Sequence, residues 1–251
     1  MPYLKYINDE GFNIARGLVR HTSHINKFGR STALNGNFET VWSVGTPMVY
    51  PDRANTVIVV SSSGDDTAGG TGAQKIEISG IDENYYANTL TIPLAGDSEA
   101  SNTDIKFWRV YRTVVTNCGS GGTNDGNITL TIGGNTASFV AASDGQSLQS
   151  TFTTAKNQTG YIIDMMVNTG KDNKAGLFRL VQRHINNGNV FNTKQIIENY
   201  RNSIITTFPV PLVIPPLHDI EIQGKNTSDS SAMSGVGNFN IVLVEDPFID
   251  E

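Results

Sequence analysis

The side chains best suited to chemistry are few in this sequence: four histidines, one cysteine and a few neighbouring carboxylates. His21 and His24 are three residues apart and on a helix would offer two metal ligands on one face, but no adjacent acid or histidine completes a set. His184 falls in an alternating strand pattern and His218 follows two prolines, so we expect surface or loop positions for both. The sequence therefore predicts no metal centre and no cofactor.

The adjacent carboxylates Asp65 and Asp66 have two interpretations. They are compatible with calcium binding or with a glycosidase pair. In a loop rich in Ser and Gly, however, adjacent acids more often cap a turn and face solvent. Cys118 has no basic residue or histidine near it in sequence, which favours a small buried hydrophobic role over a nucleophilic one. With no G-x-S-x-G, H-E-x-x-H or Walker-type motif present, we expect a protein that is not an enzyme.

Carbohydrate binding is a stronger alternative than catalysis. Aromatic platforms beside amides and acids suit sugar rings, and Tyr85 and Tyr86 in DENYYANT form an exposed-looking pair. Trp108 and Tyr111 lie in the strongest strand pattern, where aromatic residues more often belong to a core or an interface. Tyr85 and Tyr86 are therefore the candidate glycan contacts.

The composition excludes several classes of protein. Only 17% of residues are charged, the net charge is −6, and Gly and Asn each contribute 25 residues. The apolar fraction of 38% is enough to build a core. No apolar run reaches the length of a membrane helix, and the N-terminus is not expected to be a signal peptide. One cysteine allows no internal disulfide, and a pI near 5.2 argues against nucleic-acid binding.

Charge is unevenly distributed along the chain. Residues 1–30 carry five basic and two acidic side chains, a net charge of +3, whereas the remainder carries −9. A cationic leader on an acidic body indicates an arm that docks on an acidic surface, such as the body of a neighbouring copy. A frayed terminus with incidental charge is the alternative.

The elements that must position these residues are mostly strands. Short runs of alternating or β-branched residues are separated by Gly, Asn, Asp and Ser clusters. Helix signals are poor and are confined to residues 9–19 and a turn or two at 195–202. The predicted strands occupy residues 56–61, 75–81, 89–94, 106–116, 127–132, 137–141, 147–154, 161–167, 177–185, 190–197, 204–213, 219–223 and 239–244.

This pattern predicts an all-β fold: an antiparallel β-sandwich, jelly-roll-like domain preceded by a smaller β-sheet domain and an N-terminal arm. The glycine-rich run at 118–127 provides the natural division. We therefore expect a docking arm over residues 1–35, a first β domain over 36–117 and a C-terminal sandwich over 118–251.

The order of several motifs resembles a family of virion structural proteins from tailed, including marine, bacteriophages. The resemblance runs from about residue 25 to the C-terminus. It rests on KFGR at 27–30, VIVVSSSGDDTAGGTGAQKIEISGIDENY at 57–85, WRVYR at 108–112, GSGGTNDGNITL at 119–130 and PVPLVIPPLHDIEIQGKNTS at 209–228.

The resemblance implies a non-enzymatic structural protein that assembles on the particle as a capsid decoration or a neck or tail component. Its partners would be other virion proteins and its own copies, with no nucleic acid and no membrane, and it would be assembled in the host cytoplasm. A host-recognition head of a spike or fibre, binding surface glycan, is the alternative function. Docking of the arm is predicted to use the apolar residues Phe12, Ile14, Leu18, Ile25 and Phe28 and the basic residues Arg16, Arg20, Lys27 and Arg30.

Overall fold

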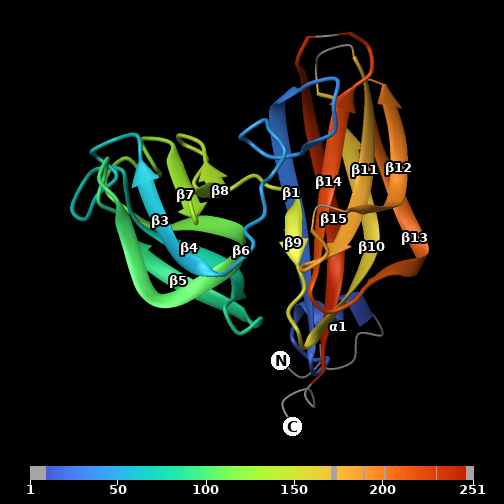
Figure 1. Cartoon of the computed structure of the whole chain (residues 1–251), viewed down its shortest axis with the longest axis horizontal. Helices are drawn as coiled ribbons and strands as arrows, with labels where there is room; N and C mark the ends of the chain where they lie inside the picture. The colour runs from blue at the N-terminus through green and yellow to red at the C-terminus, as the bar shows by residue number, and fades with distance from the viewer. Residues whose placement is uncertain (1–9, 171–173, 189, 201, 230, 247–251) are drawn as a thin grey trace, which may run out of the picture.

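The structure is a computed structural model that describes residues 10–170, 174–188, 190–200, 202–229 and 231–246. It consists almost entirely of antiparallel strands, which confirms the predicted all-β fold (Figure 1). In chain order the elements are α1 (Glu10–Ala15), β1 (Thr22–Leu34), β2 (Glu39–Thr40), β3 (Asn55–Ser61), β4 (Ala73–Asp82), β5 (Ala87–Pro93), β6 (Ala100–Cys118), β7 (Ile128–Ile132), β8 (Asn135–Val140), β9 (Thr151–Thr153), β10 (Gln158–Asn168), β11 (Ala175–His184), β12 (Asn192–Tyr200), β13 (Ser203–Ile214), β14 (His218–Asn226) and β15 (Met233–Glu245).

Two sheets form the sandwich. One has the strand order β1-β15-β10-β13, and the other has the order β12-β11-β14-β2, with β9 also paired to β14. Alternate residues of β15 point between the sheets, so that Phe239, Ile241 and Leu243 are buried. They pack against residues such as Phe178 and Ile222 from the opposite sheet, in a single apolar core. The burial of these alternating side chains is what holds the sandwich together.

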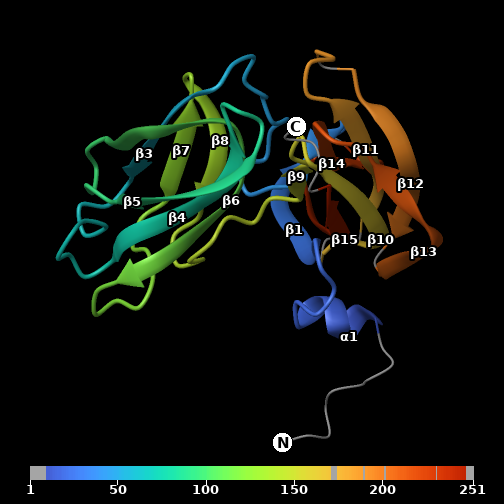
Figure 2. The same cartoon turned by 90° about the horizontal axis from the view of Figure 1, so that it is seen from below.

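A second unit contains the six-stranded sheet β5-β4-β6-β3-β7-β8. Strand β6 is 19 residues long; its first part pairs with β3 and its second part with β4. It also reaches β8, where Thr113 Oγ1 lies 2.9 Å from Ser138 Oγ, so the sheet curls around its own core. This unit lies beside the edge of the sandwich formed by β1, β2 and β9, whereas β12 and β13 lie at the far edge (Figures 1 and 2).

The sheets do not follow the expected division at residues 35 and 117. Strands β1 and β2 belong to the sandwich, and β7 and β8 belong to the six-stranded sheet, so this sheet is inserted between β2 and β9. The glycine-rich run at 118–127 connects β6 to β7, two strands of one sheet that both pair with β3. Residues 22–34, expected in an arm, form β1 because their backbone pairs with β15 along its whole length.

Two helix expectations had different outcomes. Within residues 9–19, α1 covers Glu10–Ala15 and is followed by Gly17, whose φ of 68° is the left-handed conformation that closes helices. Residues 195–202 carried a poor signal for a turn or two of helix, but most of them lie in β12, where the β-branched Ile197 is buried against β11. None of the helices in the described ranges is long and apolar enough to cross a membrane.

Gly29 gives a direct test of how closely β1 packs against the connection to β9. A methyl group added at this residue would overlap the carbonyl oxygen of Val41 and the amide nitrogen of Ser150, both of which are backbone atoms. We expect Gly29→Ala to lower the free energy of unfolding by roughly 1–3 kcal/mol, measured by urea denaturation.

The matched control is Gly36→Ala, because no atom lies within 4 Å of the methyl group added there. This variant should stay within about 0.5 kcal/mol of the wild type. Equal stability of the two variants would contradict the packing described for β1.

Candidate functional site

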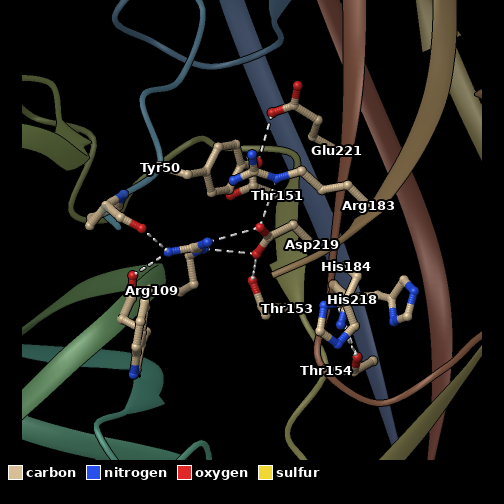
Figure 3. Close-up of polar contacts among 12 residues, drawn as sticks. Tyr50, Arg109, Thr151, Thr153, Thr154, Arg183, His184, His218, Asp219 and Glu221 are labelled. Atoms are coloured by element: carbon tan, nitrogen blue, oxygen red, sulfur yellow. Dashed lines mark hydrogen bonds and ion pairs between the residues drawn. The ribbon is translucent and has the colours of Figure 1, made fainter. Parts of the chain in front are cut away.

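Asp219 of β14 lies at the centre of a buried ion cluster where the two β units meet (Figure 3). Arg109 of β6 donates from Nε to Oδ1 at 2.9 Å and from Nη2 to Oδ2 at 3.1 Å, a bidentate pair. Arg183 of β11 donates from Nε to Oδ2 at 3.0 Å, and Thr153 donates its hydroxyl to Oδ1 at 2.7 Å. The carboxylate thus accepts four hydrogen bonds, and one of its two cations comes from the six-stranded sheet.

Strand register brings three of these residues together. Arg183 and Thr153 stand directly opposite Asp219 on the strands to either side of β14, so their side chains share one face of the sheet. The neighbouring Ile220 points to the opposite face and is buried in the sandwich core. Arg109 then completes the cluster by covering this outer face from β6.

The ring of Tyr50 packs against both arginines of the cluster. Its ring centroid lies 4.9 Å from the guanidinium carbon of Arg109 and 4.2 Å from that of Arg183, within the range of cation–π attraction. Its hydroxyl donates to Glu221 Oε2 at 2.8 Å, and the Thr40 hydroxyl donates to the same oxygen at 3.1 Å. Two guanidinium groups and two carboxylates therefore share this junction.

Burial governs the ionisation of the Tyr50–Glu221 pair. Desolvation raises the pKa of Glu221 above its ordinary value, although hydrogen bonds from Gln223, Tyr50 and Thr40 act in the opposite direction. Desolvation also raises the pKa of Tyr50 well above its ordinary value, and the nearby Glu221 and Asp219 carboxylates raise it further. Tyr50 is therefore a neutral hydrogen-bond donor at neutral pH.

A cleft of about 380 Å³ opens beside the ion cluster. Trp108, Tyr50 and Ile185 give it an aromatic and apolar lining, and Asp52 and Asn186 are exposed at its rim. Other residues of the lining are Pro51, Arg183 and Gly188. Because Arg183 is already engaged by Asp219 and by the main-chain carbonyl of Gly188, the groups available to a ligand are aromatic faces, one carboxylate and one amide, a combination that suits a polyhydroxylated molecule.

Tyr85 and Tyr86, the two residues predicted to contact glycan, pack against different neighbours. Tyr85, whose φ is 68°, stacks on Trp108 with ring centroids 5.4 Å apart and an interplanar angle of 21°. The ring of Tyr86 is covered by the ammonium group of Lys156 at 3.8 Å. Only Tyr85 is thus continuous with the aromatic lining of the cleft. Both rings are half-buried.

Two of the four histidines, His184 and His218, are in contact. They are not the two, His21 and His24, whose spacing in the sequence is compatible with metal binding. His184 and His218 face each other across β11 and β14, with ring centroids 5.2 Å apart and nearly perpendicular. His24 lies on β1 beside Asn240, 3.2 Å from its Oδ1, whereas His21 occupies the turn before that strand. No group of three or more His, Cys, Asp or Glu side chains that could hold a metal ion occurs among the described residues.

The acidic pair has unequal environments. Asp65 is exposed, whereas Asp66 is fully buried and accepts hydrogen bonds from Ser61 Oγ at 2.6 Å and from the amides of Ala73, Asp125 and Gly126. Burial alone would raise the pKa of Asp66, but these hydrogen bonds together lower it. Asp66 therefore organises the loops around it instead of facing solvent as expected.

Cys118 is the last residue of β6 and is half-buried. It is thus less enclosed than a small core residue would be.

The predicted docking residues occupy two different settings. Phe12 and Leu18 are exposed on and after α1, with Arg16 over the ring of Phe12 at 5.5 Å. Two further predicted docking residues precede β1: Ile14, which is half-buried, and Arg20, which is exposed.

The other four docking residues belong to β1. Ile25 packs against the sandwich core and Lys27 is buried, so neither is free to insert into a partner. Phe28 is half-buried and Arg30 exposed on the opposite face of the strand.

Arg109, Arg183 and Asp219 were not predicted as site residues. Their sequence signal is weak: each arginine interrupts an apolar strand pattern, and Asp219 follows a histidine after two prolines. Only the pairing of distant strands brings residues 110 positions apart into one cluster.

Removing the central charge should be costly. Asp219→Asn would leave two buried guanidinium groups with one counter-charge fewer, so we expect it to lower the free energy of unfolding by about 3–5 kcal/mol in urea denaturation. The matched control, Asp52→Asn at the exposed rim, should change this free energy by about 0.5 kcal/mol or less. A small effect of Asp219→Asn would show that the cluster does not hold the junction together.

No family model and no curated protein matches this chain. Among solved structures, the infectious bursal disease virus Gx strain aligns over 90% of this chain and 72% of its own, with 8% identity and a TM-score of 0.27. The Arthrobacter globiformis T6 isomalto-dextranase complexed with panose aligns over 89% of this chain and 35% of its own, with 11% identity and a TM-score of 0.24. Scores of this size establish no common fold.

Proposed function

We propose that this protein is a non-enzymatic structural subunit of a virus particle that associates with its own copies and with other virion proteins. The virion assignment, including a place as a capsid decoration or in the neck or tail, follows from the resemblance of its motifs to phage structural proteins. One observation supports the association: the outer face of the sheet β1-β15-β10-β13 carries few charges.

This surface, called here the neutral face, consists of three rows of residues paired across four strands. The rows are Val213–Tyr161–Val242–His24, Thr207–Asp164–Asn240–Asn26 and Ile205–Met166–Asn238–Phe28. Asp164 is the only carboxylate in these rows, which contain no Lys or Arg; the next row along the same face carries one cation, Arg30. Most outward sheet faces carry charge for solubility, so a neutral and partly apolar face favours burial against a partner.

Hydrogen bonds hold the middle row in place. Asn26 Nδ2 donates to Asn240 Oδ1 at 2.8 Å, and Asn240 Nδ2 donates to Asp164 Oδ1 at 2.8 Å. Four polar atoms of this row are thus bonded to one another within the sheet, which lowers the cost of removing these atoms from water. On either side, Ile205 and Val213 are 67% and 53% exposed, so both flanking rows have apolar area to bury.

The segment before β1 extends this association surface. Helix α1 lies at one end of the sandwich next to β1 (Figure 2). Phe12 and Leu18 are 43% and 55% exposed, close in sequence to the cations Arg16 and Arg20. Apolar anchors with basic neighbours suit docking onto an acidic protein surface, and the rest of this chain is such a surface.

Charge introduced on the neutral face should prevent association. We expect the double variant Ile205→Lys/Val213→Lys to sediment as a folded monomer at concentrations where the wild type forms oligomers, because two lysines would have to be buried at the contact. Analytical ultracentrifugation measures this.

Deleting residues 1–20, which leaves β1 intact, should weaken incorporation into particles.

The matched control is Val190→Lys/Ile196→Lys, which changes two residues that are 62% and 53% exposed outside the neutral face. It should associate as the wild type does. A wild-type protein that remains monomeric at every concentration, or loss of association in both double variants, would contradict the role of the neutral face.

Host-glycan recognition is the second candidate function, and the stacking of Tyr85 on Trp108 beside the cleft favours it. A sugar ring placed against the aromatic lining would find the Asp52 carboxylate and the Asn186 amide at the rim. In this function the protein would be the recognition head of a spike or fibre.

The glycan function has its own test. With a neutral oligosaccharide such as maltohexaose as the probe, we expect Tyr85→Ala and Trp108→Ala each to weaken binding about fivefold to tenfold in calorimetry, since an aromatic contact contributes about 1 kcal/mol. Asn84→Ala, an exposed change in the same loop, should bind as the wild type does. Equal binding by all four proteins would place any sugar contact outside this cleft.

A further inference from the structure

Lys27 is a buried cation at the junction that the ion cluster does not use. It lies on β1, is 5% exposed, and points toward the side of β6. Its ammonium group donates a hydrogen bond to the main-chain carbonyl of Tyr111 and lies 5.8 Å from the centre of that ring. A carbonyl and an aromatic face are weak compensation for the water that a buried ammonium group loses.

The cation nearest to Lys27 increases this cost. Arg112 follows Tyr111 on β6, is exposed, and lines the same space as Lys27. Within the part of the chain that the structure describes, no carboxylate forms an ion pair with either residue. This contrasts with Arg109 and Arg183 nearby, which both bind Asp219. Lys27 and Arg112 thus form a doubly positive site with no internal counter-ion.

The site lies in an open groove between the two β units. Two connected hollows of about 290 and 310 Å³ share Ile25, Asn26, Lys27 and Arg112. On one wall the lining runs along consecutive residues of β1, from His24 to Phe28. The other wall is built by Tyr111 and Arg112, by residues 87–89 of β5, and by Gln146 and Ser147. Among the residues that the structure describes, the lining contains no carboxylate.

The wall along β1 is a free strand edge. Strand β1 pairs only with β15, and over residues 22–28 no backbone hydrogen bond to another described segment occupies its other side. From Arg30 onward this side is closed, because the Arg30 amide donates to the carbonyl of Leu148 at 3.5 Å. An unpaired edge presents N–H and C=O groups that an extended peptide can join as an added strand.

We propose that the groove between β1 and β6 binds an extended acidic peptide segment of another protein chain, which adds to the free edge of β1 and places a carboxylate between Lys27 and Arg112. Main-chain hydrogen bonds to β1 provide affinity that is independent of sequence. The carboxylate provides selectivity, because it supplies the counter-charge that the two cations lack. This inference does not depend on a virion role.

The ionisation of Lys27 links this binding to pH. Burial, followed by the charge of Arg112, lowers the pKa of Lys27 to about 7. The other titratable groups facing the groove are Tyr111, whose pKa burial raises to about 12, and His24 on β1. Below about pH 7 Lys27 carries its charge in the free protein; above it, binding a carboxylate requires uptake of a proton, so affinity falls as the pH rises.

The test compares two peptides of alternating sequence, one with Val and Glu and one with Val and Gln, binding to the full chain in fluorescence anisotropy. At about pH 6 we expect the Glu peptide to bind at least about tenfold more tightly than the Gln peptide. Lys27→Met and Arg112→Gln should each remove most of this preference. The wild type should also lose affinity for the Glu peptide between about pH 6 and about pH 8.5 more steeply than Lys27→Met does.

Two features keep the test decisive. Lys27→Met replaces a buried charge by an apolar side chain of similar length, so it should fold and be at least as stable as the wild type. Arg30→Gln, which removes a cation from the outward face of the same strand, is the matched control and should keep the full preference. The proposal is overturned if the two peptides bind equally, if neither binds, or if Arg30→Gln lowers the preference as much as Arg112→Gln does.

Discussion

A single carboxylate, that of Asp219, is the contact on which the arrangement of the two β units depends. Two guanidinium groups reach it from different sheets, and Thr153 completes its hydrogen bonds. A charge this deeply buried is tolerated only when each of its partners is in place. Because Arg109 belongs to β6, satisfying Asp219 also fixes the six-stranded sheet against the sandwich. The rest of the junction is built around this requirement.

Three surfaces follow from the fixed junction. Tyr50 is held between Arg109 and Arg183, and the aromatic cleft opens beside it. The approach of β6 to β1 creates the groove that contains Lys27. Since the six-stranded sheet lies beside the edge of the sandwich, not over the sheet β1-β15-β10-β13, the neutral face remains open. A protein with low charge and few reactive groups thus has three places suited to binding.

The fold class was predictable because burial on one side of a sheet leaves a period of two in the sequence. This signal is clear in β4, where Ile76 and Ile78 alternate with exposed neighbours, and in β15. The period-two signal is missing from β1 because its inward positions include Lys27 and Gly29, and neither residue type is typical of an apolar core. Gly29 is required by the close approach of two backbone segments, and Lys27 is buried by a different sheet.

The candidate site was much less predictable than the fold. The aromatic pair Tyr85 and Tyr86 was identified from residue type, but stacking on Trp108 distinguishes one ring from the other. Arg109 and Asp219 carry no local pattern, because an ion pair between residues far apart in sequence leaves no periodic trace. The division of the chain was misplaced for a similar reason: a glycine-rich loop looks the same whether it joins two domains or two strands of one sheet.

By itself, the sequence determined the all-β class, the low surface charge and most of the strands, since these depend on local alternation and composition. Only the tertiary structure decided that β1 completes the sandwich, that Lys27 is buried with no counter-ion among the described residues and that Asp219 joins the two units. Those properties arise from strand pairing and from sheet-to-sheet contact over long sequence separations, and the free energy of such contacts is not encoded in any short stretch of residues.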